Sequence, residues 1–158
     1  MQINHIPEGT KHIHLIGIGG IGVSALAPEL MRRGYHVSGS DPAQNEVTQR
    51  LEKMGVPIFH QHRPENVENA DLVVVSSAIR RTNPELLAVK ERGIPVWPRA
   101  KMLGEILRKW KSIVITGAHG KTTITAMMTH VLRECGYDPT AFIGGDLPSI
   151  GGNIRLGD

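Results

Sequence analysis

The sequence predicts an α/β protein: a Rossmann-like domain built on a parallel sheet, followed by the start of a P-loop α/β central domain. Short apolar segments alternate with helical segments of about ten residues, which is the pattern of right-handed βαβ units. Two glycine-rich loops each follow an apolar segment and precede a helical one. The length of 158 residues is enough for one complete domain and part of another.

Five strands joined by helices are predicted in the first domain. Residues 12–18 form the first strand, and after a glycine turn a helix runs to Arg33 and ends at Gly34. Residues 71–79 (DLVVVSSAI) hold an apolar run without alternation, which is typical of a central parallel strand covered on both faces. The remaining strands are predicted at residues 35–41, 56–59 and 94–97, and the remaining helices at residues 45–54 and 83–93.

Pro28 falls inside the first predicted helix. Proline has no backbone N–H and its ring crowds the carbonyl of Ser24, four residues earlier, which costs about 3 kcal/mol in a helix interior. We therefore expect a kink or a later helix start at this point.

After the fifth strand the alternation pauses and then restarts. Residues 112–116 (SIVIT) are predicted as a strand, followed by a glycine loop, a helix and a further strand at residues 140–145. Two strands and one helix leave sheet edges bare and one face uncovered, so we expect this second domain to continue in a longer protein. The predicted division is residues 1–98 for the first domain, 99–111 for a linker helix and 112–158 for the incomplete second domain.

Composition excludes several classes of protein. The chain has 18 basic and 15 acidic residues, a net charge of +3, which is too small an excess for a nucleic-acid-binding surface. No segment approaches 18 consecutive apolar residues, and residues 1–12 lack the pattern of a secretory signal. The single cysteine, Cys135, excludes a disulfide framework. We therefore expect a cytoplasmic protein without nucleic-acid or membrane partners.

The first glycine loop, residues 17–22 (GIGGIG), matches the pattern G-x-G-x-x-G between a strand and a helix. In this pattern Gly17 permits the tight turn, Gly19 lets the backbone approach a pyrophosphate, and Gly22 lets the helix pack against the strand. Asp41 ends the second strand, where an acidic residue commonly binds ribose hydroxyls. These observations predict a nucleotide-type ligand, and this loop alone leaves an NAD-dependent oxidoreductase open.

The second loop, residues 116–123 (TGAHGKTT), follows a predicted strand and opens a helix, as a phosphate-binding P-loop does. It is a contracted version, because Ile115 stands where the full pattern has glycine. Backbone N–H groups from Gly117 onward can surround a phosphate, Lys121 can neutralise phosphate oxygens, and the Thr122 hydroxyl can bind Mg²⁺. A dehydrogenase would leave this loop unexplained.

Seven segments together resemble the Mur ligase family. They are HLIGIGGIGVSALA (14–27), VSGSD (37–41), VVVSSAI (73–79), NPEL (83–86), IPVWPRAKML (94–103), TGAHGKTT (116–123) and the glycine-rich stretch 143–157. The resemblance implies that the first domain binds a UDP-sugar, with its loop on a UDP diphosphate, and that an ATP-binding central domain follows.

The resemblance implies an ATP-dependent, ADP-forming ligase of peptidoglycan precursor synthesis, and hence a role in cell-wall biogenesis, cell shape and cell division. Such a ligase phosphorylates the carboxylate of UDP-N-acetylmuramate, and the amine of L-alanine then attacks the acyl phosphate. ATP and Mg²⁺ are the implied cofactors, and UDP-N-acetylmuramate and L-alanine are the implied substrates. A recycling ligase that adds a whole peptide to the same UDP-sugar is an open alternative.

Site residues follow from the same resemblance. Lys121 is the implied catalytic residue, which stabilises the transferring phosphoryl group, and Thr122 is the implied Mg²⁺ ligand. Because the family's acidic metal ligands and amino-acid-binding domain fall outside these 158 residues, we expect the chain alone to bind uridine nucleotides without ligating. The implied ATP-binding residues are Gly117, Ala118, His119, Gly120, Lys121, Thr122 and Thr123. The implied UDP-substrate-binding residues are Gly19, Gly20, Ile21, Gly22, Asp41, His62, Ser76, Ser77, Ala78 and Asn153.

Overall fold

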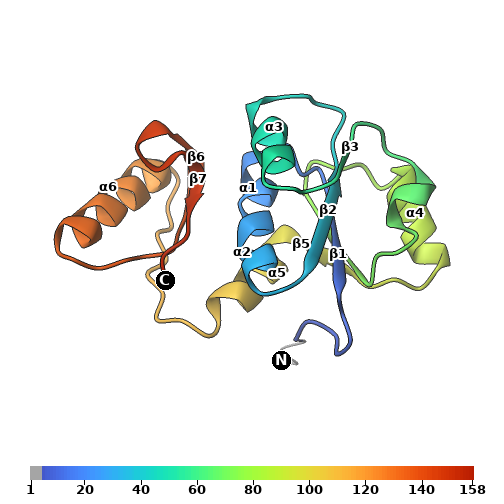
Figure 1. Cartoon of the computed structure of the whole chain (residues 1–158), viewed down its shortest axis with the longest axis horizontal. Coiled ribbons are helices and arrows are strands. Elements are labelled where there is room, and N and C mark those ends of the chain that lie inside the picture. Colours follow the sequence, from blue (N-terminus) through green and yellow to red (C-terminus); the bar gives the residue numbers. More distant parts are fainter. Residues whose placement is uncertain (1–4) are drawn as a thin grey trace. The chain divides into compact units, whose positions relative to one another are not determined.

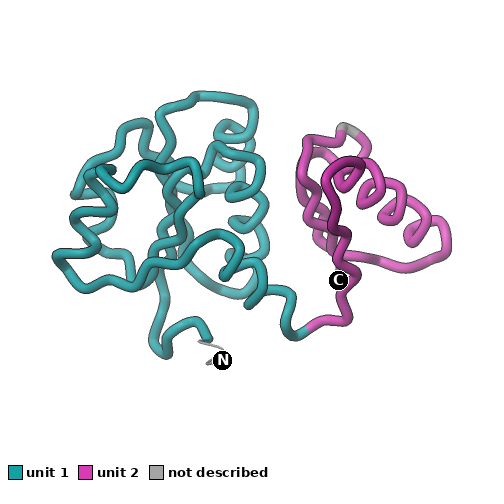
Figure 2. The backbone as a smooth tube through the Cα atoms, turned by 180° about the vertical axis from the view of Figure 1, so that it is seen from behind, with its two compact units in different colours: residues 1–109 teal, residues 110–158 magenta. Residues whose placement is uncertain are grey.

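A computed structural model describes residues 5–158, and the predicted α/β class is confirmed (Figure 1). The chain forms two compact units, of which the first ends at Lys109 and the second begins at Trp110 (Figure 2). Within the described residues, no helix is long and apolar enough to cross a membrane.

Unit 1 is built on a five-stranded parallel sheet in the order β3-β2-β1-β4-β5, so the predicted parallel sheet is confirmed. The chain moves outward from β1 to β3 on one side and then crosses back to add β4 and β5 on the other. Open α/β sheets bind ligands at this kind of switch point, outside the carboxyl ends of the strands. The strands are β1 (His12–Ile16), β2 (His36–Ser40), β3 (Ile58–Phe59), β4 (Leu72–Val75) and β5 (Val96–Pro98).

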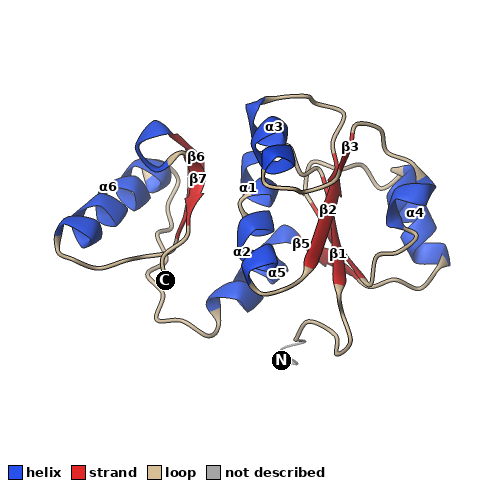
Figure 3. Ribbon diagram, viewed as in Figure 1, coloured by secondary structure: helices blue, strands red, loops and turns tan. Residues whose placement is uncertain are grey.

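Helices cover both faces of this sheet (Figure 3). Helices α1, α2, α3 and α5 lie on one side and α4 lies on the other. This double covering explains the apolar character of the central strands, whose side chains meet helices on either face. The helices are α1 (Ile21–Ser24), α2 (Leu26–Arg32), α3 (Glu46–Lys53), α4 (Pro84–Glu91) and α5 (Arg99–Leu107), with a 3₁₀ turn η1 (Pro64–Val67) before β4.

The core of unit 1 lies around β1 and β4. Ile13, Leu15 and Leu72 are completely buried, which confirms residues 71–79 as the source of a central strand, although pairing stops at Val75. The segment that we expected to link two domains forms α5 within unit 1, where Met102 and Ile106 are also completely buried. These two side chains fix α5 to the sheet.

Pro28 has the effect that the sequence predicts. The helix after the glycine loop is interrupted at Ala25, and a new helix, α2, begins at Leu26. Pro28 is then the third residue of α2, a position whose N–H has no partner within the helix in any case. The interruption therefore removes most of the energetic penalty of the proline.

Unit 2 contains one helix and an antiparallel hairpin. The strand predicted at residues 140–145 is confirmed as part of β6, but the strand predicted at residues 112–116 is wrong. Those residues pair with no other strand in the described part of the chain, and Ile113 and Val114 are 66% and 69% exposed. A β-strand needs a neighbouring strand for its ladder of backbone hydrogen bonds, so this segment is not part of a sheet. The elements are α6 (Lys121–Glu134), β6 (Ala141–Leu147), a 3₁₀ turn η2 (Pro148–Ile150) and β7 (Gly152–Arg155).

At Gly39 the backbone of β2 lies very close to Ile18 of the glycine loop. A Cβ at this position would lie 2.5 Å from Cδ1 and 2.7 Å from Cβ of Ile18, which is itself completely buried. We expect Gly39→Ala to lower the free energy of unfolding by about 2 kcal/mol or more, the usual range for overpacking. Urea denaturation of the 158-residue chain measures this change.

The matched control is Gly104→Ala in α5, where no atom lies within 4 Å of the added Cβ. Alanine is favoured over glycine in a helix, so this change should raise the free energy of unfolding by about 0.5–1 kcal/mol. Equal stability of the two variants would contradict the close approach of β2 to Ile18.

Candidate functional site

The carboxyl ends of the central strands bring together the predicted UDP-substrate residues of unit 1. The glycine loop follows β1, Asp41 follows β2 and His62 lies beyond β3. Ser76, Ser77 and Ala78 form the turn after β4, in which the Ser76 hydroxyl accepts the N–H of Ala78 at 3.3 Å. Because the strands are parallel, these four connections lie at one edge of the sheet, at the switch point.

Hydrogen bonds join the glycine loop to the end of β2. The N–H groups of Gly17 and Ile18 both donate to the carbonyl oxygen of Ser40, at 2.8 and 3.2 Å. Gly17 has a φ of +80°, and its carbonyl accepts the N–H of Gly20 at 3.1 Å, which closes a tight turn before α1. A Cβ on Gly17 would lie 3.0 Å from Cβ of Ser76, so the loop is confined between the ends of β2 and β4.

Gly19 and Asp41 contact each other directly. Oδ2 of Asp41 accepts the N–H of Gly19 at 2.9 Å, and Oδ1 accepts the N–H of Ala43 at the same distance. A Cβ on Gly19 would lie 2.8 Å from Cγ of Asp41, so only glycine lets this carboxylate approach the loop. Gly19 therefore provides space for Asp41, a role that the sequence pattern did not predict.

Arg99 is a candidate site residue that our sequence analysis missed. It begins α5, directly after the carboxyl end of β5, and its side chain lies against the loop: a Cβ on Gly22 would be 3.0 Å from Cδ and 3.2 Å from Nε of Arg99. Within residues 5–158 its guanidinium has no carboxylate partner. The signal in the sequence is a basic residue immediately after the fifth strand.

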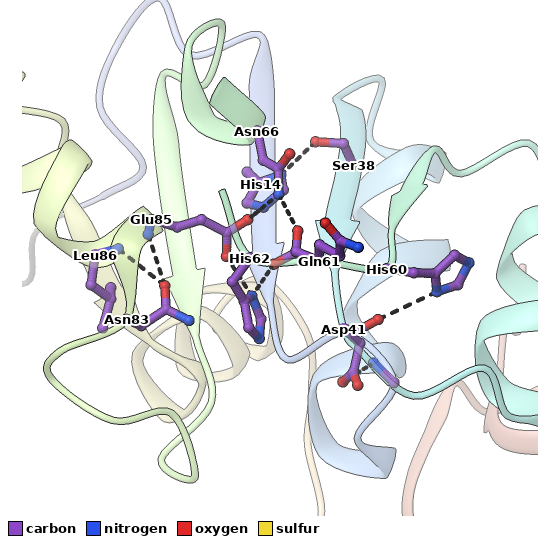
Figure 4. A network of polar contacts seen from close by, with 12 residues as sticks. His14, Ser38, Asp41, His60, Gln61, His62, Asn66, Asn83, Glu85 and Leu86 are labelled. Atoms are coloured by element: carbon purple, nitrogen blue, oxygen red, sulfur yellow. Dashed lines mark hydrogen bonds and ion pairs between the residues drawn. The ribbon is translucent and has the colours of Figure 1, made fainter. Parts of the chain in front are cut away.

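A second missed residue, Glu85, lies in the first turn of α4 and is completely buried (Figure 4). Its Oε2 accepts hydrogen bonds from Oγ of Ser40 at 2.6 Å and from Nδ1 of His62 at 2.7 Å. Its Oε1 accepts the side-chain N–H of Asn66 at 2.6 Å and lies 3.5 Å from Nε2 of His14. The carboxylate thus connects β1, β2, α4 and the segment after β3.

The environment of Glu85 favours its ionised form. Burial raises the pKa of the Glu85 carboxyl, but the contacts led by His14 and Ser40 outweigh burial and hold the pKa below its ordinary value. In sequence, Glu85 is an acidic residue in the first turn of a helix, capped by Asn83, whose side chain accepts the N–H of Glu85 at 2.9 Å. Acidic residues are common in the first turn because they stabilise the helix dipole, so the sequence does not indicate that Glu85 belongs to a buried network.

Unit 2 brings together the predicted ATP-binding residues at the start of α6. Nζ of Lys121 donates to the carbonyl oxygens of Gly117 and Ala118, at 2.5 and 2.9 Å, so the loop curves around its own ammonium group. Gly120, with a φ of +79°, precedes the first residue of α6. Residues 117–121 are exposed. The predicted loop residues are therefore contiguous and accessible.

The glycine pair in β6 makes room for the side chain of Thr122. A Cβ on Gly144 would lie 3.1 Å from Oγ1 of Thr122, and one on Gly145 would lie 3.0 Å from its Cγ2. Asn153 is buried on β7, also in unit 2, and so belongs to a different unit from the other predicted UDP-substrate residues.

Comparison with known proteins shows the family. Residues 12–111 match the family model described as Mur ligase family, catalytic domain. This chain is a member of the Mur ligase family. The resemblance in the sequence is thereby confirmed, and the oxidoreductase alternative is not favoured.

Two curated relatives of this Mur ligase chain carry the name UDP-N-acetylmuramate–L-alanine ligase. The one from Desulfatibacillum aliphaticivorans is 55% identical over 145 residues, which is 92% of this chain and 32% of the relative. The one from Thiobacillus denitrificans is 52% identical over 150 residues, 95% of this chain and 32% of the relative. The chain spans about a third of the length of the curated relatives it matches.

Solved structures of Mur ligases share the fold. The UDP-N-acetylmuramate–alanine ligase of Thermotoga maritima has a TM-score of 0.87 and 39% identity, covering 94% of this chain and 35% of that one. The UDP-N-acetylmuramate:L-alanyl-γ-D-glutamyl-meso-diaminopimelate ligase of Neisseria meningitides has a TM-score of 0.87 and 30% identity, covering 94% and 47%. Both kinds of Mur ligase therefore have this fold over these residues.

The buried carboxylate makes stability depend on pH. Because the pKa of Glu85 is lowered in the folded state, its ionised form stabilises the fold above the unfolded-state pKa, and this contribution is lost as pH falls through the folded-state pKa. We expect the free energy of unfolding to fall more steeply between about pH 5 and pH 3 for the wild type than for Glu85→Gln.

Urea denaturation across this range measures the difference. Glu52→Gln is the matched control, because Glu52 also pairs with a histidine, His60, at 3.0 Å but is exposed. It should keep the wild-type slope. A Glu85→Gln slope equal to that of the wild type would contradict the prediction.

Proposed function

We propose that this protein is an ATP-dependent ligase that joins L-alanine to UDP-N-acetylmuramate, and that unit 1 binds the UDP-sugar. The observation that carries the proposal is the pairing in one chain of a glycine loop at a sheet switch point with a P-loop at α6, in the order found in relatives of that name at 52–55% identity. Each loop suits an anionic phosphate, and a ligase of this type needs both a nucleotide-linked acid and ATP.

In unit 1 the diphosphate of the UDP-sugar is assigned to the loop of residues 17–22. The N–H of Gly19 already donates to Asp41 and that of Gly20 to Gly17, so neither is free to serve the ligand without rearrangement. Arg99 supplies the positive charge beside this loop, and a guanidinium can bind phosphate oxygens through two parallel hydrogen bonds. Asp41 is assigned to the uridine and the turn at residues 76–78 to the sugar.

In unit 2 the residues fit ATP and Mg²⁺. The fit rests on the exposed loop that curves around the Nζ of Lys121, and on the hydroxyl of Thr122 as an oxygen ligand of the kind that Mg²⁺ prefers. Residues 117–123 would hold ATP, and Mg²⁺ would lie on Thr122. When bound, ATP would supply the phosphoryl group, and Mg²⁺ would neutralise the negative charge that develops on it. Lys121 adds a fixed positive charge at the same place.

The proposed reaction has two steps. A carboxylate oxygen of the muramate attacks the γ-phosphorus of ATP, ADP leaves, and an acyl phosphate forms. The amine of L-alanine then attacks the acyl carbon, and inorganic phosphate leaves. We place this reaction in the cytoplasm, which agrees with an exposed, unpaired Cys135.

A ligase that adds a peptide to the same UDP-sugar is the second candidate. It is supported by the TM-score of 0.87 with the ligase of Neisseria meningitides. The higher identity to alanine ligases, 39% in the Thermotoga maritima structure against 30%, favours alanine as the second substrate.

Binding calorimetry tests the ligand of unit 1. The 158-residue chain should bind UDP-N-acetylmuramate and UDP but not NAD⁺. Arg99→Ala should weaken the binding of UDP-N-acetylmuramate about tenfold, or about 1.4 kcal/mol, because the lost charge faces the diphosphate. The binding of uridine should be unchanged.

Lys101→Ala is the control, since it also removes a positive charge from α5. The Nζ of Lys101 lies 4.0 Å from the ring centre of Trp97. It should not alter UDP-N-acetylmuramate binding. Tight NAD⁺ binding without UDP-sugar binding would overturn the proposal.

A coupled ADP-release assay tests whether the 158-residue chain can catalyse the reaction without the remainder of a full-length ligase. With UDP-N-acetylmuramate, L-alanine and Mg-ATP, the 158-residue chain should show no turnover above background, because phosphoryl transfer needs carboxylates that position the metal. Turnover that disappears in Lys121→Ala would show instead that these residues suffice.

A further inference from the structure

A half-buried histidine at the candidate UDP-sugar site is anchored to a buried carboxylate (Figure 4). We propose that Glu85 is a positioning residue that fixes the ring proton of His62 on Nδ1 and thereby presents Nε2 of His62 to the UDP-sugar. The identity of the ligand rests on the proposed function above, whereas the position of the proton does not.

The carboxylate of Glu85 requires His62 to act as the hydrogen-bond donor. Glu85 is completely buried, and an ionised carboxylate can only accept hydrogen bonds. Since Oε2 of Glu85 lies 2.7 Å from Nδ1 of His62, the proton of that bond is on Nδ1. The hydroxyl of Ser40, 3.1 Å from Nδ1, donates to the same carboxylate oxygen at 2.6 Å and closes a triangle of polar contacts.

The other ring nitrogen of His62, Nε2, is available to a ligand. The side chain is 16% exposed, and Nε2 has no hydrogen-bond partner within residues 5–158, although it is not a buried atom. With the proton held on Nδ1, a neutral ring offers a lone pair on Nε2. That lone pair accepts a hydrogen bond from a hydroxyl or amide N–H group, both of which a UDP-sugar carries.

His14 and His60, the other histidines labelled in Figure 4, lack an accessible ring nitrogen without a hydrogen-bond partner. Nδ1 of His14 bonds to Ser38 at 2.8 Å, and its Nε2 is buried without a hydrogen bond, 3.5 Å from Glu85. His60 contacts the backbone carbonyl of Asp41 at 3.3 Å through Nδ1 and Glu52 at 3.0 Å through Nε2. His62 alone among these three combines a buried anchor with an accessible nitrogen.

The protonated nitrogen of His62 is measured directly by NMR of the chain labelled with ¹⁵N-histidine. In the neutral ring we expect the proton on Nδ1, and we expect the Nε2 resonance to shift when UDP-N-acetylmuramate is added. In Glu85→Gln the proton should redistribute toward Nε2, and in Glu52→Gln it should stay on Nδ1. A wild-type His62 protonated on Nε2 would overturn the inference, and this measurement needs no variant to fold.

A double-mutant cycle then separates positioning from support of the fold. We expect Glu85→Gln to weaken UDP-N-acetylmuramate binding about fivefold to tenfold in the wild-type background, and to have no effect on binding in a His62→Ala background. The same loss in both backgrounds would show that Glu85 acts on the fold alone. Parallel titrations with UDP show whether the contact is to the sugar or to the nucleotide.

Two substitutions of His62 provide a further check. Asn places its amide near the position of Nδ1 and keeps the contact to Glu85, whereas Gln places its amide near the position of Nε2. We expect His62→Gln to retain more affinity than His62→Asn, and the reverse order would contradict the proposal. If the wild type binds no UDP-sugar although His62 carries its proton on Nδ1, the proposed function fails and the positioning stands.

Discussion

The candidate site depends on Ser40, which makes contacts in two directions at the end of β2. Its carbonyl oxygen accepts the N–H groups of Gly17 and Ile18, at 2.8 and 3.2 Å, and thereby sets the path of the glycine loop. Its hydroxyl donates to the buried carboxylate of Glu85 at 2.6 Å. One residue therefore connects the glycine loop to the buried carboxylate, so that the backbone of the candidate site and the buried charge are held at the same point.

The two units differ in how far they bury their apolar residues. In unit 1 the central strands are covered on both faces, and the buried core reaches into α5 at Met102 and Ile106. In unit 2 the helix that carries the P-loop exposes Met127 and Val131, at 63% and 54%. The proposed UDP-sugar site thus lies in a unit whose apolar core is closed, and the proposed ATP site lies in a unit whose helix has apolar side chains left uncovered by the described residues.

Local patterns allowed much of this fold and site to be predicted. The parallel sheet, both glycine loops and the helix start near Pro28 were evident because apolar runs, glycines and proline act through their immediate neighbours. The strand at residues 112–116 was wrong because pairing depends on a partner that local sequence does not reveal. Glu85 was missed for the same reason: its neighbours Ser40 and His62 are 45 and 23 residues away. Arg99 meets the loop only through the folding of β5 beside β4.

The ammonium group of Lys121 bridges the carbonyl oxygens of Gly117 and Ala118, so the curvature of the phosphate loop is held by the chain itself. Ordering a flexible glycine-rich segment around an incoming anion costs conformational entropy at the moment of association. Here the segment is preorganised by its own cation, and that entropic cost is met during folding. The backbone of this loop is therefore ordered before any anion binds, so the affinity of the proposed ATP site would depend on charge and shape complementarity more than on ordering of the loop.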